Sequence, residues 1–290
     1  MKQLDEHVFG PWALVTVAAS GIGEEFARQA AANGINVVLL ARREERLKEV
    51  VAELAARYGV QAGVVVSDLG RDGILDRVTG ATGDLGIDLL VSNAGVGNPG
   101  PFISLPRERL REIVQLSVIT HLDLAHHFGQ RLTKRGRGGI VLVSAAAAAG
   151  GLPCMANDSA TKACPLNLGE ALHVELSGAG VDVTVLAPVL VNTGVAARMG
   201  IGAVPQPAGP VSAEQAVDEA LTALQEAPGD HGHARGLDRG VRRHQGSRGR
   251  GDQSAPRGVP ACVLNRSRPA AARQRTSSRS PLVSTGKEIR

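Results

Sequence analysis

The first 226 residues of this 290-residue chain alternate short apolar runs with amphipathic stretches, and this alternation limits the possible folds more than any other feature. Buried parallel strands have continuous apolar sequences, and each must be joined to the next by a crossover. Six runs are predicted strands: 12–17, 36–40, 61–66, 87–92, 139–144 and 181–186. Helices are predicted at 23–33, 43–58, 106–132, 158–178 and 213–226. Right-handed crossovers then predict a three-layer, doubly wound parallel sheet that binds ligand at the carboxyl ends of its strands.

The composition changes after residue 228. Residues 230–290 carry 13 Arg and one Lys against four acidic residues, a charge of +10, whereas the first 229 residues carry −6. An Arg-, Gly-, Ser- and Pro-rich segment without periodicity is expected to be disordered. We therefore divide the chain into a domain over 1–228 and a basic tail over 229–290. The tail could bind nucleic acid electrostatically, but it has no aromatic residue for stacking, which makes this the weaker interpretation.

Other features indicate a cytoplasmic protein. No apolar run approaches the roughly 20 residues of a membrane span, and nothing at the start resembles a signal peptide. The three cysteines, Cys154, Cys164 and Cys262, have no metal-ligand spacing, and the histidines lack acidic or cysteine partners. No metal site is therefore expected.

A turn of small residues joins the first predicted strand to the first helix. Residues 13–23 read ALVTVAASGIG, and such a turn lets backbone N–H groups at the helix start face a pyrophosphate. The stretch resembles the TGxxxGIG loop of the short-chain dehydrogenase/reductase family. The resemblance implies a cofactor loop that includes Thr16, Ser20, Gly21, Ile22 and Gly23.

Further segments match this family in order and spacing, over about residues 10 to 226. The resemblance implies a small-molecule carbonyl or alcohol substrate and a nicotinamide nucleotide cofactor, with Asp68 at the adenine and Asn93 beside the cofactor. The other implied cofactor residues are Arg42, Arg43, Leu69, Ala94, Gly95, Lys162, Pro188 and Thr193.

The end of the second strand favours NADP(H). An acidic residue there would accept the ribose hydroxyls of NAD, but this chain has Ala41 followed by Arg42 and Arg43. Guanidinium groups suit a 2′-phosphate. The alternative is that both arginines only solvate the start of the next helix.

The resemblance places the four catalytic positions of the family at Ser117, Ala145, Asp158 and Lys162. The family has Asn, Ser, Tyr and Lys there, so only the lysine is retained. In the family the tyrosine exchanges a proton with the carbonyl, the lysine lowers the phenol's pKa and holds the ribose, the serine hydrogen-bonds the carbonyl oxygen, and the asparagine anchors a water relay.

These losses predict a severely reduced or absent activity. Asp158 lies four residues before Lys162 on one helix, and we expect a carboxylate that stays ionised beside the ammonium and only accepts hydrogen bonds. Loss of general acid catalysis costs about 10² to 10⁴ in rate, and loss of an oxyanion donor about 10² to 10³. Neighbouring Ser144 should point to the opposite face, and the only tyrosine, Tyr58, should lie far away.

The cofactor loop is altered as well. Val17 stands where the family has its first glycine, and Val189 replaces the glycine after Pro188. A stiff β-branched side chain at Val17 should crowd the adenosine side. We expect weakened NADP(H) binding.

The changes at these positions are each one base away from the family residue and follow no new chemical logic, which is typical of decay. The family's last strand would follow the helix that ends near Glu226, and a frameshift near residue 229 would explain its absence. The sheet would then lack its edge strand, and the homo-oligomer typical of the family is doubtful. Alternatives to a weakened oxidoreductase are a non-catalytic nucleotide-binding pseudoenzyme and nucleic-acid association through the tail.

Overall fold

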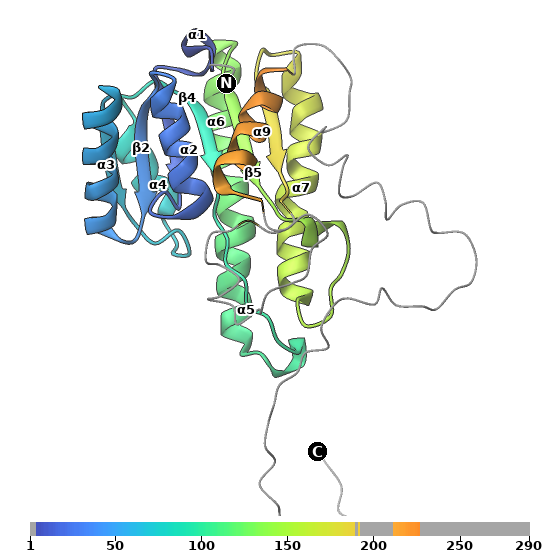
Figure 1. The fold of residues 1–290 in the computed structure, drawn as a ribbon. Coiled ribbons are helices and arrows are strands. Elements are labelled where there is room, and N and C mark those ends of the chain that lie inside the picture. The colour runs from blue at the N-terminus through green and yellow to red at the C-terminus, as the bar shows by residue number, and fades with distance from the viewer. Residues whose placement is uncertain (1–3, 189–190, 192–210, 227–290) are drawn as a thin grey trace, which may run out of the picture. The chain divides into compact units, whose positions relative to one another are not determined.

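A six-stranded parallel sheet forms the centre of the computed structural model (Figure 1), which describes residues 4–188, 191 and 211–226. The strand order is β3-β2-β1-β4-β5-β6. Because the chain returns from β3 to pair β4 with β1, the direction of winding reverses between β1 and β4. The doubly wound prediction is confirmed. The strands are β1 Trp12–Thr16, β2 Asn36–Ala41, β3 Ala62–Val66, β4 Ile87–Ser92, β5 Gly139–Val143 and β6 Asp182–Leu186.

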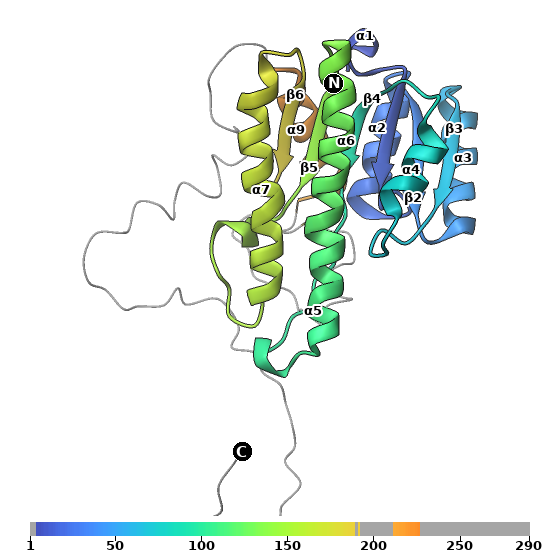
Figure 2. The same ribbon diagram turned by 180° about the vertical axis from the view of Figure 1, so that it is seen from behind.

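Helices cover both faces of the sheet, as Figures 1 and 2 show from opposite sides. One face carries α2 (Gly21–Ala32), α3 (Glu44–Tyr58) and α9 (Ala213–Gln225), with the short α1 (Glu6–Phe9) nearby. The other face carries α4 (Ile74–Thr82), α6 (Thr120–Arg135) and α7 (Ala156–Ser177).

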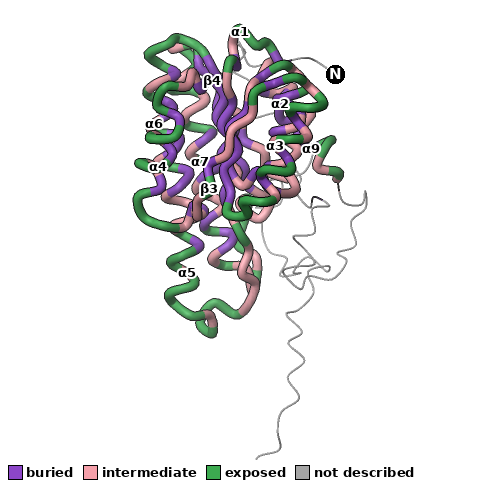
Figure 3. The backbone as a smooth tube through the Cα atoms, turned by 90° about the vertical axis from the view of Figure 1, so that its left-hand side faces the viewer, coloured by how far each residue is buried: buried purple, intermediate pink, exposed green. Residues whose placement is uncertain are grey.

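The two layers arise because alternate strand residues point to opposite faces. Val15 and Leu39 pack into the core on the α2 side, whereas Leu14 and Leu40 pack into the core on the α6 side. All four residues are fully buried. The buried backbone therefore runs through the middle of the molecule, between two outer layers (Figure 3).

The long helix predicted over 106–132 is interrupted. The structure has α5 (Arg107–Val114), a π-helical turn η2 (Gln115–Ile119) and then α6. In this turn the carbonyl of Gln115 accepts the Thr120 N–H five residues on and also the Thr120 hydroxyl, at 3.1 Å. The same hydroxyl donates to the Leu69 carbonyl at 2.8 Å, which fixes the turn to the end of β3. Such π-turns are frequent at functional sites, and this one contains Ser117.

Helix α4 was not predicted from the sequence. Its residues include Thr79 and Gly80, which have low helix propensity. Ile74 and Val78 are 3% and 0% exposed, so packing on the sheet stabilises a helix that its composition alone does not favour. The short helices α1, η1 (Phe102–Ser104) and η3 (Ala146–Ala149) were also not predicted.

A buried carboxylate ties three segments together at the amino end of β4. Asp88 is 1% exposed and accepts hydrogen bonds from Arg135 and from Arg137, whose Nε lies 3.1 Å from Oδ2. Arg135 also donates to the Ile87 carbonyl at 2.8 Å, and Arg137 to the His7 carbonyl at 3.0 Å. These contacts join β4 to the end of α6 and to α1.

Several sequence-based predictions concern residues outside the described ranges. They are the cofactor contact of Thr193, the replacement at Val189, the missing last strand and the basic tail beyond residue 226. Within the described ranges, β6 is the last strand in the chain. A search of the same ranges found no helix with the length and apolar character needed to span a membrane.

Candidate active site

Lys162 lies on α7 and approaches the carboxyl end of β5. Its Nζ donates a hydrogen bond to the carbonyl oxygen of Val143 at 3.3 Å. Burial lowers the pKa of Lys162 to about 8, and the negative charge of Asp158 partly opposes this. The residue at the predicted lysine position thus has a pKa well below that of an ordinary lysine.

Asp158 lies one turn before Lys162 on α7 and is 5% exposed. Its two carboxylate oxygens accept the backbone N–H of Asn98, at 3.1 and 3.0 Å. Burial raises the pKa of Asp158, while the Asn98 N–H and the charge of Lys162 act in the lowering direction.

Asp158 and Lys162 do not form a close ion pair, although the charge of each still shifts the pKa of the other. In the described part of the chain no carboxylate oxygen lies within 4.0 Å of the Lys162 Nζ. The spacing of four residues puts both side chains on one face of α7, but the carboxylate turns toward Asn98 and the ammonium toward Val143. Burial therefore shifts the pKa of Asp158 more than the charge of Lys162 does.

Ser117 occupies the asparagine position in the π-turn and is fully buried. Its Oγ has no hydrogen-bond partner among the described residues. Gly95 lies between Ser117 and Lys162: a Cβ at Gly95 would lie 2.5 Å from the Lys162 Nζ and 3.5 Å from the Ser117 Oγ. Only a glycine at position 95 therefore leaves room for the lysine in this arrangement.

His121 is a site residue that the sequence reasoning missed. It is fully buried, its Nδ1 lies 2.8 Å from the Ser92 hydroxyl, and its Nε2 lies 2.9 Å from the Ala94 carbonyl oxygen. Burial, and then the charge of Lys162, lower its pKa to about 3. A carbonyl only accepts, so Nε2 carries the proton of a neutral imidazole and Nδ1 accepts from Ser92. Its position one helical turn after Ser117 could have indicated that His121 lies at the site.

Ala145 lies two residues after the end of β5 and has a methyl group at the predicted serine position. Neighbouring Ser144 is 3% exposed and donates from Oγ to the carbonyl oxygen of Lys162 at 2.6 Å. The Ser144 hydroxyl therefore donates to the α7 backbone, which agrees with the prediction that Ser144 and Ala145 point to opposite faces. The carbonyl of Pro188 accepts the Ala146 N–H at 2.9 Å, which holds the end of β6 beside this turn.

The cofactor-loop residues lie at the carboxyl end of β1. Thr16 is fully buried, and its hydroxyl donates to the Val91 carbonyl at 3.3 Å and accepts the Asn93 N–H at 2.7 Å. A Cβ at Gly23 would lie 2.5 Å from the Val17 carbonyl oxygen and 2.7 Å from the Asn93 Nδ2. The end of β1 and the start of α2 thus approach too closely for any residue but glycine.

The start of α2 offers donors. Its first residue is Gly21, with φ of +59°, and the Ser20 side chain makes no capping hydrogen bond. The first N–H groups of a helix have no partner within it and attract anions. Ile22 in this first turn packs against the core on the α2 side.

Val17 adopts a backbone conformation that suits glycine. Its φ is +54°, in the left-handed region where a β-branched residue is strained by about 1 to 2 kcal/mol. Its side chain packs against the core cluster on the α6 side of the sheet, which contains Leu14 and Leu40. The crowding of the adenosine side stays a prediction.

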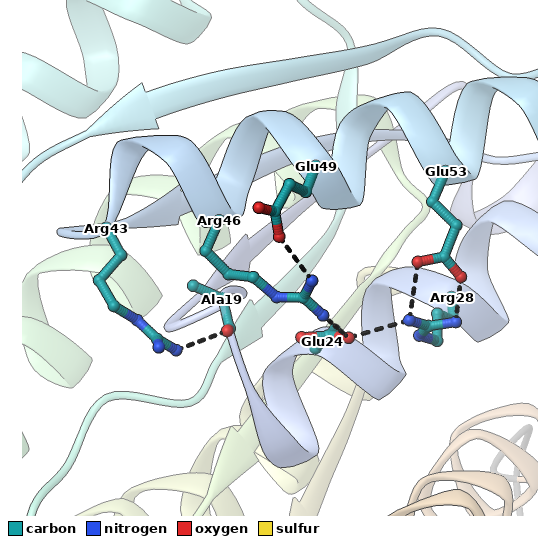
Figure 4. Close-up of polar contacts among 7 residues, drawn as sticks. All are labelled: Ala19, Glu24, Arg28, Arg43, Arg46, Glu49 and Glu53. Atoms are coloured by element: carbon teal, nitrogen blue, oxygen red, sulfur yellow. Dashed lines mark hydrogen bonds and ion pairs between the residues drawn. The ribbon is translucent and has the colours of Figure 1, made fainter.

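The two arginines after β2 differ in their contacts. Arg43 donates from Nη2 to the Ala19 carbonyl in the glycine-rich loop at 2.7 Å (Figure 4). Exposed Arg42 has no partner among the described residues. Behind them, Glu24 of α2 binds Arg28 and Arg46 at 2.9 and 2.8 Å. The glycine-rich loop is thereby attached to α3. Of the two arginines, Arg42 is the one whose guanidinium is not bound by a described residue.

Asp68 and Leu69 follow β3. The Asp68 Oδ1 accepts the Gly70 N–H at 3.0 Å, and its side chain lines an open cavity of about 300 Å³. Leu69 is buried and presents its carbonyl to Thr120. The cavity shares no residue with the group around Lys162. The structure thus divides the candidate site into a Lys162 end, near β4 and β5, and an Arg42–Asp68 end, near β2 and β3.

Comparison with known proteins agrees with this geometry. A family model described as short chain dehydrogenase matches residues 11–201. This chain belongs to the short-chain dehydrogenase family. A short-chain dehydrogenase from Sphingobium yanoikuyae, solved in complex with NADPH, superposes with a TM-score of 0.71 at 31% identity, covering 86% of this chain and all of that one.

Curated relatives include both an enzyme and a protein named inactive. The 7beta-hydroxysteroid dehydrogenase of Collinsella aerofaciens is 32% identical over 178 residues, which are 61% of this chain and 68% of that protein. The human inactive hydroxysteroid dehydrogenase-like protein 1 is 32% identical over 193 residues, 65% of this chain and 58% of that protein. The chain thus spans less than two thirds of the human relative's length.

The residues present fit a nicotinamide nucleotide in part. Gly95 leaves open space beside the Lys162 Nζ, the start of α2 offers free N–H groups, and Arg42 is free to contact a phosphate. Val17 is the exception, because it adopts a φ of +54° that suits glycine and adds a side chain where the family has none.

Proposed function

We propose that this chain is a nucleotide-binding oxidoreductase of the short-chain dehydrogenase family whose carbonyl-reducing or alcohol-oxidising activity is severely reduced or absent. NADP(H) is the proposed nucleotide, and Arg42 and Arg43 support this choice. A bound nicotinamide nucleotide would supply the hydride. Lys162, Asn93 and the start of α2 would hold it.

The observation that carries the proposal is the environment of Asp158. A tyrosine at this position would carry its hydroxyl across a whole ring from Cβ, whereas the aspartate carboxyl ends close to α7 and binds Asn98. A raised pKa makes Asp158 a better proton donor than an ordinary aspartate, but its oxygens do not reach where the phenol would act. Ala145 provides no donor for the developing oxyanion.

A titration with NADPH tests the proposal directly. We expect saturable quenching or enhancement of NADPH fluorescence by the purified full chain, without oxidation of NADPH when aldehydes or ketones are added. Arg42→Ala should weaken NADPH binding while leaving NADH binding unchanged, and Arg57→Ala, at the far end of α3, is the matched control. Brisk turnover of any carbonyl would contradict the proposal, and so would an absence of saturable binding.

Val17→Gly is expected to tighten NADPH binding by at least about fivefold, which corresponds to about 1 kcal/mol. The substitution removes both the crowding side chain and the strain of φ +54°. Val17→Ala separates these causes, because alanine keeps the strained backbone and removes only the two γ-methyl groups. If crowding dominates, both variants bind more tightly, and if backbone strain dominates, only the glycine variant does. Unchanged affinity in both would show that Val17 does not limit binding.

A further inference from the structure

The Lys162 amine is unusual in having no charged partner at close range. Its Nζ donates one hydrogen bond, to the Val143 carbonyl, and Asp158 is turned away toward Asn98. As a residue Lys162 is half-buried, and burial of its amine is the main cause of its lowered pKa. Ala145, two residues beyond the end of β5, adds only a methyl group.

Among the described residues, the titratable groups that influence Lys162 are Asp158 and His121. Asp158 on α7 is the one group that raises the pKa of Lys162, and it does so less than burial lowers it. His121 on α6 is neutral above pH of about 3. The elements from β4 and β5 contribute backbone carbonyls and Asn98, which carry no charge. With a pKa of about 8, close to a quarter of the amine is unprotonated at pH 7.5, roughly 200-fold more than for an ordinary lysine.

Two buried polar atoms of this region have no partner among the described residues, and one of them lies near the amine. The Ser117 Oγ and the Asn98 Nδ2 are both buried and unbonded among the described residues. The Ser117 Oγ and the Lys162 Nζ face the same side of Gly95. Buried polar groups are almost always hydrogen-bonded, so an unpartnered hydroxyl next to an amine indicates a place for a polar atom of a ligand.

We propose that Lys162 acts as a nucleophile and forms an imine with small carbonyl compounds. The neutral Nζ attacks the carbonyl carbon, a C–N bond forms, and the carbonyl π electrons move to oxygen, which takes up a proton. The resulting carbinolamine loses its oxygen as water, and a C=N bond remains. No oxidant or reductant is consumed, and no nucleotide is needed, so the inference goes beyond the proposed function.

Reductive trapping on the intact wild-type chain tests the inference. The protein is incubated without nucleotide at pH 7.5 with propanal and sodium cyanoborohydride, which converts an imine to a stable propyl-lysine that peptide mass spectrometry locates. The matched control is Lys48, whose side chain is 55% exposed and whose pKa is raised by Glu44 and Glu45. Initial labelling at Lys162 should exceed that at Lys48 by at least about tenfold, given the difference in unprotonated amine.

Two further measurements sharpen the outcome. Asp158→Asn removes the charge that raises the pKa of Lys162, so labelling of Lys162 at pH 7.5 should become faster. In wild-type protein unfolded with urea, the preference for Lys162 over Lys48 should disappear. Lys162 labelled no faster than Lys48 in the folded chain would overturn the inference. If NADPH binds as proposed and labelling is still unselective, the imine inference fails alone, and selective labelling without NADPH binding would contradict only the proposed function.

Discussion

The double variant Asp158→Tyr, Ala145→Ser is expected to reduce carbonyl compounds with NADPH at least about 100-fold faster than the wild-type chain. The tyrosine restores a proton donor worth about 10² to 10⁴ in rate, and the serine a hydrogen-bond donor to the oxyanion worth about 10² to 10³. Such contributions are not additive, and Ser117 still lacks the family's amide, so the expected gain stays near the lower end of the combined range. Lys162 is already in place to lower the pKa of the introduced phenol.

The new ring must displace the Asn98 segment, because the Asn98 N–H now binds the carboxylate of Asp158. Asp158→Phe, Ala145→Ser is therefore the matched control: it introduces the same ring without the hydroxyl. Rates are measured as NADPH oxidation with a panel of aldehydes and cyclic ketones at saturating NADPH. If the tyrosine and phenylalanine variants are equally slow while both still bind NADPH, the missing phenol is not what limits this chain.

Asp88→Ala is expected to lower the free energy of unfolding by about 3 kcal/mol. Removing one partner of a buried charge pair costs roughly 3 to 5 kcal/mol, and the lower end applies because the two arginines are 29% and 47% exposed. Asp88 also anchors Arg135 and Arg137 where they hold the carbonyls of Ile87 and His7, so its loss loosens β4, α6 and α1 together.

Urea unfolding followed by far-UV circular dichroism measures this effect. Asp84→Ala is the matched control, because Asp84 is exposed, lies four residues earlier and has no partner among the described residues. It should change the free energy of unfolding by no more than about 0.5 kcal/mol. A loss below about 1 kcal/mol for Asp88→Ala would show that solvent replaces the carboxylate and that the three segments are held by packing alone.

The strands could be predicted almost to the residue because their signal is local. Runs such as Ile87–Ser92 are apolar throughout, and a segment buried on both faces has no other stable place. Helix α4 and the π-turn could not be predicted in this way. The first depends on the packing of Ile74 and Val78, and the second on the Thr120 hydroxyl bound to the carbonyl of Leu69, 51 positions away in the chain.

The candidate site shows the same division. The family resemblance located Lys162, Asp158, Ala145 and Ser117 and indicated which functional groups differ, since a chemical group is present or absent whatever the fold does. Spacing placed Asp158 beside Lys162, but it could not show that the carboxylate binds the Asn98 N–H, because neighbours along a helix compete with partners from other segments. His121 and Asn98 were missed for the same reason.

The sequence by itself therefore determined the doubly wound fold, the absence of a tyrosine and a serine at the catalytic positions, and the valine in the cofactor loop. Only the tertiary structure decided the burial and the hydrogen bonding of the residues that are present at the site. The lowered pKa of Lys162, the binding of Asp158 to the Asn98 N–H and the unpartnered Ser117 hydroxyl arise where β4, β5, the π-turn and α7 meet. The physical reason is that burial and hydrogen bonding depend on which distant segments surround a group, and the local sequence does not contain that information.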